Sequence, residues 1–173
     1  MKPLTAPHVE IRRTDPIAVT DEDAAEKPEA VLPALRLMLQ GREQESFIML
    51  TLNNQGRVDG WREVARGLAD QVQVPVREML RTALVCDARA IIIAHNHPSG
   101  DSRPSQADIR LTERVINACE DVGCPLVDHL IIGSGESYYS FMRATRGWDI
   151  FGKKTAADGA AVMAARPPPD LED

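Results

Sequence analysis

Aromatic side chains are scarce in this sequence, since Phe, Trp and Tyr together make up only 4% of its 173 residues. Val, Ile, Leu and Ala must therefore fill the core, which is ordinary for a compact α/β domain. No apolar run approaches the roughly 18 residues that a membrane-spanning helix needs, and residues 1–20 lack the apolar core of a secretory signal. We therefore expect a cytoplasmic protein without a membrane partner.

Cysteine is equally sparse, with Cys86, Cys119 and Cys124 at irregular spacing. An odd number of irregularly spaced cysteines makes a poor disulfide framework, so reduced thiols in or near the core are expected. Three cysteines are also too few for a closed four-cysteine zinc site. Any metal in this protein would need other ligands.

Positive charge is in short supply, and the formal net charge is −6. This balance does not support a dedicated nucleic-acid binder, which usually carries a basic patch. Lysine occurs only in the two ends, so the middle of the chain relies on arginine for its positive charge. A local basic face there, and with it a nucleic-acid partner, stays open as an alternative.

The composition divides the chain into three parts. Residues 1–28 are polar and proline-bearing, which is typical of a flexible N-terminal arm, and residues 151–173 carry three consecutive prolines near their end, as a flexible tail would. Between them, residues 29–150 alternate between helical and strand patterns. Hydrophobic spacing predicts helices over 31–40, 76–84 and 105–122, and strands over 47–52, 57–66, 88–94, 126–132 and 137–142. Strands interleaved with helices favour a layered α/β domain.

The sharpest chemical signal follows the apolar run 88–94, which is typical of a strand buried on both faces. His95 and His97 stand two residues apart on extended chain, so their side chains should point the same way. Asp108 lies in the first turn of the next predicted helix and could turn back toward them. Two imidazoles and one carboxylate leave a fourth position open for water, as in a catalytic zinc site.

Two plainer interpretations compete with the metal site. Ser105 and Asp108 also have the spacing of a helix capping box, in which both side chains satisfy backbone N–H groups. A histidine pair of this kind can be a surface or core feature without a ligand. The pair Asp128-His129 is open in the same way, either as a structural hydrogen bond, which we favour, or as a group that orients a metal ligand.

The full pattern resembles the JAMM/MPN metalloprotease signature of His-x-His, seven residues, Ser, two residues and Asp. The resemblance is closest to the RadC branch of that superfamily and covers about residues 30–148. It is carried by His95-Asn96-His97-Pro98-Ser99-Gly100-Asp101, Pro104-Ser105 with Asp108, Asp128-His129-Leu130-Ile131-Ile132-Gly133 and Tyr139-Ser140-Phe141.

The resemblance implies a three-layer α-β-α sandwich with a mixed sheet, related to the cytidine deaminases. It implies that His95, His97 and Asp108 bind Zn²⁺ and that Ser105 stabilises the tetrahedral intermediate. A general base is expected in a Gln-Glu-x-Phe setting, which selects Glu45, with Glu63 as its rival. Deaminase activity is excluded, because the His-x-Glu and Pro-Cys-x-x-Cys motifs that it requires are absent.

The expected function is therefore a zinc metallohydrolase in which metal-activated water attacks a peptide or isopeptide bond of a peptide or protein substrate. The alternatives are a metal-dependent nuclease or DNA-repair-associated protein, and a non-catalytic interaction module. RadC proteins usually carry an N-terminal helix-hairpin-helix region, whereas residues 1–28 are only polar here, which weakens a DNA role. Gly67-Leu68 and Pro75-Val76-Arg77-Glu78 also depart from the family pattern, at the expected edge of the substrate groove. The pattern carries no signal for oligomeric state.

Overall fold

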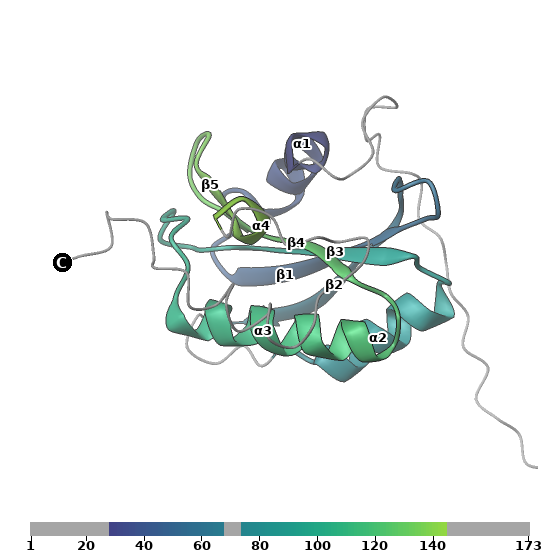
Figure 1. Cartoon of the computed structure of the whole chain (residues 1–173). Coiled ribbons are helices and arrows are strands. Elements are labelled where there is room, and N and C mark those ends of the chain that lie inside the picture. Colours follow the sequence, from purple (N-terminus) through teal and green to yellow (C-terminus); the bar gives the residue numbers. More distant parts are fainter. Residues whose placement is uncertain (1–27, 68–73, 145–173) are drawn as a thin grey trace, which may run out of the picture.

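The computed structural model describes residues 28–67 and 74–144, so nearly all of the predicted arm and the whole predicted tail lie outside the described residues. The elements follow one another along the chain as α1 (Pro28–Leu39), β1 (Glu45–Leu52), β2 (Val58–Gly67), α2 (Val76–Val85), β3 (Ala90–Asn96), α3 (Gln106–Asp121), β4 (Leu126–Ile132), β5 (Tyr138–Ser140) and α4 (Phe141–Ala144) (Figure 1).

The five described strands form one mixed sheet in the order β2-β1-β3-β4-β5. Strand β1 is antiparallel to both β2 and β3, β3 is parallel to β4, and β5 is antiparallel to β4. The parallel pair requires a crossover, which α3 provides. This arrangement brings the carboxyl ends of β3 and β4 to the same edge of the sheet as the first residues of β1.

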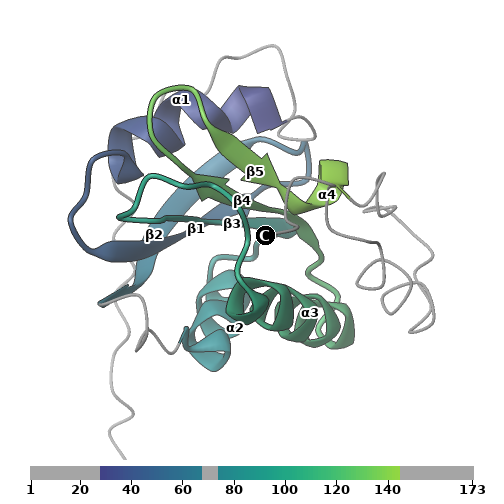
Figure 2. The ribbon, with the colours of Figure 1, turned by 90° about the vertical axis from the view of Figure 1, so that its left-hand side faces the viewer.

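Helices cover both faces of the sheet, with α1 on one side and α2 and α3 on the other (Figure 2). Each face has its own apolar core. The core under α1 includes Leu35, Ile48, Ile92 and Leu130, and the core under α2 and α3 includes Met49, Met79, Ile93 and Val115. The central strands β1, β3 and β4 are buried along their whole length. The expected three-layer α/β fold with a mixed sheet is confirmed.

The last strand is shorter than predicted. The pattern indicated extended chain over 137–142, but β5 ends at Ser140 and a turn of helix, α4, follows. The Ser140 hydroxyl accepts a hydrogen bond from the Arg143 N–H at 3.2 Å, and Asp128 Oδ1 accepts one from the Met142 N–H at 3.0 Å. These contacts satisfy two of the free amide groups at the start of the helix and so favour its formation.

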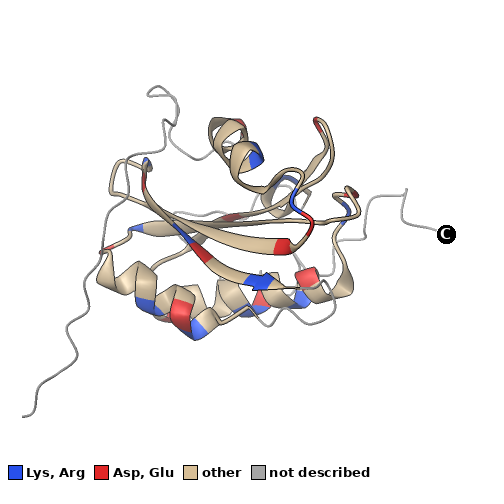
Figure 3. Ribbon diagram, turned by 180° about the vertical axis from the view of Figure 1, so that it is seen from behind, with Lys and Arg blue, Asp and Glu red and all other residues tan. Residues whose placement is uncertain are grey.

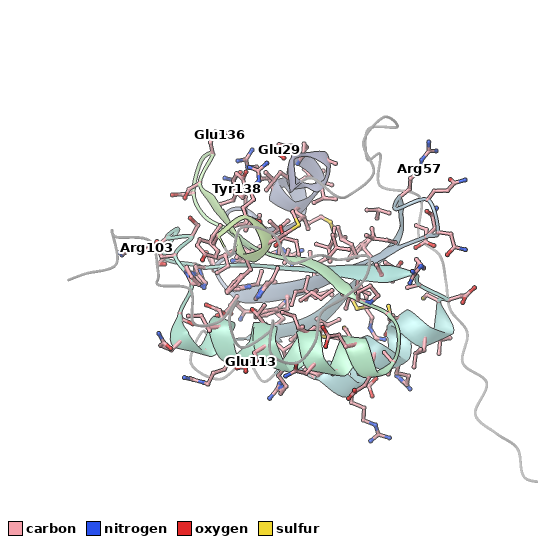
Figure 4. All side chains as sticks on the ribbon, viewed as in Figure 1. Glu29, Arg57, Arg103, Glu113, Glu136 and Tyr138 are labelled. Atoms are coloured by element: carbon pink, nitrogen blue, oxygen red, sulfur yellow. The ribbon has the colours of Figure 1, made fainter. Side chains whose placement is uncertain are left out.

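Polar contacts fasten α1 to the turn between β4 and β5. Arg36 forms an ion pair with Glu136 at 2.5 Å, and Gln40 Nε2 donates to the Gly135 carbonyl oxygen at 2.6 Å. Glu29 and Glu136 lie at the same end of the molecule, over α1 and this turn (Figure 4). Within the described part of the chain, no helix combines the length and the apolar character needed to cross a membrane.

Candidate metal centre

The predicted histidine pair lies at the carboxyl end of β3. His95 is the penultimate residue of that strand, and His97 follows its last residue. The chain then turns at Gly100, whose N–H donates to the His97 carbonyl oxygen at 2.9 Å and whose φ of 80° suits glycine. The loop enters α3, and Asp108 is the third residue of that helix. A buried strand end and a helix start thus hold all three side chains.

The three side chains converge as the spacing predicted. His95 Nε2 lies 3.1 Å from His97 Nε2 and 3.2 Å from Asp108 Oδ1, and His97 Nε2 lies 3.4 Å from Asp108 Oδ2. A tetrahedral zinc ion with bonds of about 2.0–2.1 Å has ligand-to-ligand edges of about 3.3 Å. The donor atoms therefore have the separations that such an ion requires.

The proton positions also suit a cation. His97 Nδ1 lies 2.7 Å from the Asp101 carbonyl oxygen, which can only accept, so this nitrogen carries the proton. In the neutral ring, the Nε2 lone pair then faces His95 and Asp108. The Asp108 carboxylate is likewise an acceptor. Acceptors this close repel one another unless a proton or a metal ion lies among them, so the group could hold a cation.

The ionisation of the three groups reflects their burial and mutual contact. Burial alone would raise the pKa of the Asp108 carboxyl, but hydrogen bonds with His95 and His97 outweigh it and hold that pKa well below its ordinary range. Hydrogen bonding to Asp108 raises the pKa of His97 above its ordinary value. Burial lowers the pKa of His95, which is fully enclosed. Without a metal, the site favours an ionised Asp108 beside a proton on His97.

The capping-box interpretation holds as well. Asp108 Oδ2 accepts hydrogen bonds from the Ser105 N–H at 2.7 Å and the Ser105 hydroxyl at 2.6 Å, while the Ser105 hydroxyl accepts from the Asp108 N–H at 3.2 Å. The same carboxylate therefore starts α3 and faces the histidines. Because the Ser105 hydroxyl proton is directed at Asp108, it can reach another acceptor only if that bond breaks.

Glu45 and Glu63 have different surroundings. Glu45 is buried at the first residue of β1, and its charge contributes to the raised pKa of His97. Glu63 lies on β2, where it forms ion pairs with Arg66 at 2.6 Å and Arg42 at 2.8 Å. The Arg66 guanidinium, opposed in part by burial and supported by Arg42, lowers the pKa of Glu63.

A cavity of about 1260 Å³ opens beside the three converging side chains. Among the residues that the structure describes, Glu45, His97, Ser105 and Asp108 line it and Glu63 does not. The rest of the wall includes apolar side chains and two arginines from α3, among them Phe47, Val74, Leu111, Arg110 and Arg114. The cavity therefore joins a possible metal, a buried carboxylate and a surface that could bind a substrate.

Asn96, between the two histidines, has a role that its place in the motif does not reveal. Its side chain points to the opposite face of the sheet, where Oδ1 accepts from the Ser46 N–H at 3.0 Å. Its Nδ2 donates to the carbonyl oxygens of Arg42 at 3.2 Å and Gln44 at 3.3 Å. Asn96 thereby fixes the backbone on both sides of Glu45 relative to the histidine strand.

Asp128 and His129 separate into two roles. The Asp128 carboxylate accepts from the His129 backbone N–H at 2.7 Å and the Ser140 hydroxyl at 2.6 Å, which is the structural hydrogen bonding that we favoured. The His129 ring, on the other face, has its Nε2 2.9 Å from His95 Nδ1. Sequence reasoning found the pair but not this contact, and it missed Thr112, whose hydroxyl lies 2.7 Å from His129 Nδ1.

Phenylalanine rings hold two of these imidazoles in place. Phe47 stacks on the His95 ring with centroids 4.3 Å apart and planes inclined by 16°, and Phe141 stacks on the His129 ring at 4.9 Å and 7°. Two of the three phenylalanines in this aromatic-poor sequence therefore serve the histidine cluster.

Comparison with known proteins agrees with the pattern. The RadC-like JAB domain family matches residues 25–148. The UPF0758 protein plu4865 of Photorhabdus laumondii subsp. laumondii is 43% identical over 127 residues, which cover 73% of this chain and 54% of that protein. The chain thus spans about half the length of that relative. A family match over most of the chain, with this identity, confirms the resemblance: the chain belongs to the RadC-like JAB domain family of the JAMM/MPN superfamily.

Proposed function

We propose that this chain is a zinc-dependent hydrolase that cleaves a peptide or isopeptide bond by the attack of an activated water. One observation carries the proposal: two histidine nitrogens and a carboxylate converge at 3.1–3.4 Å beside a cavity that a buried glutamate lines. In this proposal His95, His97 and Asp108 hold the zinc ion. Residues 29–150 act as one catalytic domain, and the unpaired cysteines suit the reducing cytoplasm.

A bound zinc ion would act as a Lewis acid, lowering the pKa of water toward about 7 and polarising a carbonyl. The protein supplies the proton transfers. Glu45 accepts a proton from the attacking water and delivers it to the leaving amine, because it is the buried carboxylate that lines the cavity besides the proposed ligand Asp108. The Ser105 hydroxyl exchanges its hydrogen bond with Asp108 for one with the developing oxyanion.

A nuclease is the second candidate, and one observation favours it. Arg110 and Arg114 line the cavity on the α3 side, where they could contact an anionic backbone. Against it, positive and negative residues alternate along α2 and α3 instead of forming a basic face (Figure 3), and the net charge is −6. We therefore rank a peptide or protein substrate above nucleic acid.

Metal content of the purified chain tests the proposal first. We expect about one zinc per chain in the wild type, loss of that zinc in His97→Ala, and retention in the control Glu63→Gln. Wild type, Glu45→Gln and Glu63→Gln are then incubated with a panel of peptides, isopeptide-linked proteins and labelled DNA. Peptide cleavage that requires Glu45 supports the proposal, and DNA cleavage that requires it favours the nuclease. Zinc binding without turnover leaves an interaction module, and absence of zinc overturns the metal site.

A further inference from the structure

A buried chain of hydrogen bonds runs from the helix backbone to the candidate ligand His95. The Thr112 hydroxyl lies 2.6 Å from the Asp108 carbonyl oxygen and 2.7 Å from His129 Nδ1, and His129 Nε2 lies 2.9 Å from His95 Nδ1. Thr112, His129 and His95 are all fully buried. These hydrogen bonds link α3, β4 and β3 on the face of the sheet that carries the candidate metal site.

One acceptor, at the start of this series of hydrogen bonds, fixes the direction of every proton in the series. The Asp108 carbonyl oxygen can only accept, so the single proton of the Thr112 hydroxyl points to it. The Thr112 oxygen must then accept from His129 Nδ1–H. In neutral His129 the other nitrogen, Nε2, is an acceptor, and it takes a hydrogen bond from His95 Nδ1–H. His95 is left with its Nε2 lone pair facing His97 and Asp108.

The bond from Thr112 to the carbonyl four residues before it is common in helices and, by itself, says nothing about function. What distinguishes this site is the continuation through a second, solvent-free histidine to the first. Both ring nitrogens of His129 face neutral groups inside the protein, and the stacked Phe141 ring fixes its plane. Neither the His129 ring nor the hydroxyl can exchange its partner for water.

We propose that Thr112 and His129 are positioning residues that hold His95 in the Nδ1–H tautomer and aim its Nε2 lone pair at the metal position. The proposal rests on the function proposed above, because it concerns the preparation of that same site. His97 is held in the matching tautomer by a backbone carbonyl, that of Asp101 at 2.7 Å. Backbone oxygens thus set the tautomer of both histidines. The Asp101 carbonyl acts directly on His97, and the Asp108 carbonyl acts on His95 through Thr112 and His129.

The test compares Thr112→Val, which has nearly the same shape without the hydroxyl, with Thr112→Ser, which keeps it. A second pair compares His129→Leu with His129→Gln, whose side-chain oxygen can replace Nε2 as the acceptor. Histidine ¹⁵N NMR of the metal-free proteins reports which nitrogen of His95 carries the proton. Zinc affinity is measured by competition with a chelator, and thermal unfolding of each metal-free variant is recorded beside it.

We expect the Nδ1–H tautomer of His95 in the wild type, Thr112→Ser and His129→Gln, with zinc affinities within about threefold of one another. Loss of a group that orients a ligand costs about 10–100-fold in metal affinity, so Thr112→Val and His129→Leu should lose that much and show a mixed or reversed tautomer. A wild-type His95 protonated on Nε2 overturns the proposal. So do unchanged tautomer and affinity in Thr112→Val, even if that variant unfolds at a lower temperature.

The two readouts separate this proposal from the function on which it rests. If the wild type binds no zinc, the proposed hydrolase fails, while the NMR experiment still decides whether Thr112 and His129 set the tautomer of His95. If zinc binds with equal affinity in all four variants, the metal site stands and the positioning role fails.

Discussion

At the scale of single residues, the surroundings of a carboxylate decide its chemistry. Glu63 is held between two guanidinium groups, which keep it ionised and stabilise its charge. Glu45 is buried beside His97 in the cavity. A base must lie within reach of the proton that it takes, and among these two glutamates only Glu45 lines the cavity.

Glu45→Gln is therefore expected to lower kcat by about 10²–10⁴-fold, the usual contribution of a general acid–base group, while zinc stays bound. Glu63→Gln is the matched control. It should leave kcat within a few-fold of the wild type and cost less than about 1 kcal/mol of stability, since its ion pairs are partly exposed. Equal losses of kcat in the two variants would contradict the assignment of Glu45.

Zinc affinity should depend on pH through His97. Hydrogen bonding to Asp108 raises the pKa of His97 in the metal-free protein, and zinc can bind only the deprotonated ring. The apparent affinity is thus expected to fall about tenfold per pH unit below that raised pKa and to level off above it. Competition titrations from pH 5.5 to 9 measure this curve. If the zinc affinity did not change over this pH range, no proton would compete with zinc at His97.

Local spacing was enough to predict the candidate ligands, because His95, His97 and Asp108 all lie within one strand, one loop and one helix turn. Their neighbours could not be predicted in this way. Thr112 and His129 act through contacts between α3, β4 and β3, and such contacts arise only when the sheet assembles. Glu45 was selected through family resemblance, since a lone glutamate has no periodicity that marks it.

At the scale of elements, Asn96 joins two strand ends that the candidate reaction needs together. It fixes the backbone around Glu45 while its neighbours in sequence, His95 and His97, face the metal position. Asn96→Ala should therefore lower kcat by about 10²-fold through displacement of Glu45, with zinc affinity within about threefold of the wild type. Kinetic and metal-binding measurements on the same preparation check this. A parallel loss of zinc would place Asn96 among the groups that hold the ligands.

Asp128 fastens β4 to β5 and α4, and its ionisation should appear in the stability of the fold. Burial, only partly offset by hydrogen bonds from Ser140, Met142 and His129, raises its pKa from 3.8 to about 6. The folded state then binds the proton more tightly than the unfolded state. This contribution to stability is complete below about pH 4, and it is lost as the pH rises to about 6.

Asp128→Asn removes this titration while it keeps an oxygen for the two backbone donors. The difference in free energy of unfolding between the variant and the wild type should shift by about 2 kcal/mol in favour of the variant between about pH 4 and pH 6.5. Urea unfolding of both proteins at several pH values measures it. Parallel stability curves would show that Asp128 has an ordinary pKa.

In the last two strands, the predicted ends agreed with the structure where no side-chain hydrogen bond interrupts the pattern, and differed where one does. The predicted strand over 126–132 matches β4, which is buried along its whole length and lies between Pro125 and Gly133. The strand predicted over 137–142 was too long, because Ser140 caps α4 locally and Asp128 caps it from β4, and hydrophobic spacing reports neither hydrogen bond. The family resemblance implied only that the sheet is mixed. Its strand order came from the structure, since local patterns leave strand neighbours undetermined.

At the scale of the whole molecule, the loop that carries His97 rests on the turn between β4 and β5. The Ser134 N–H donates to the Gly100 carbonyl oxygen at 2.9 Å, and a Cβ atom added at Gly133 would lie 2.7 Å from that oxygen. The approach is possible only because residue 133 has no side chain. The backbones of the two loops are therefore in direct contact, with no space between them for a side chain at residue 133.

Gly133→Ala should force these loops apart, lowering stability by about 1–3 kcal/mol and weakening zinc binding about tenfold or more as His97 moves. Gly135→Ala, in the same turn, is the control. An alanine there meets open space but adopts a φ of 58°, which costs about 1–2 kcal/mol. Similar melting temperatures with different zinc affinities are expected. A normal zinc affinity in Gly133→Ala would mean that the His97 loop moves independently of the turn.

The β4–β5 turn is also held from its other side by α1, through Arg36 and Gln40. Helix α1, the turn and the His97 loop are thus connected in series, each by short polar or backbone contacts. A force on α1 would therefore reach the His97 loop along these polar contacts as well as through the apolar core under α1. The first described helix is thus connected to the candidate metal centre, and a tether attached to α1 is expected to change the position of His97 and with it the zinc affinity.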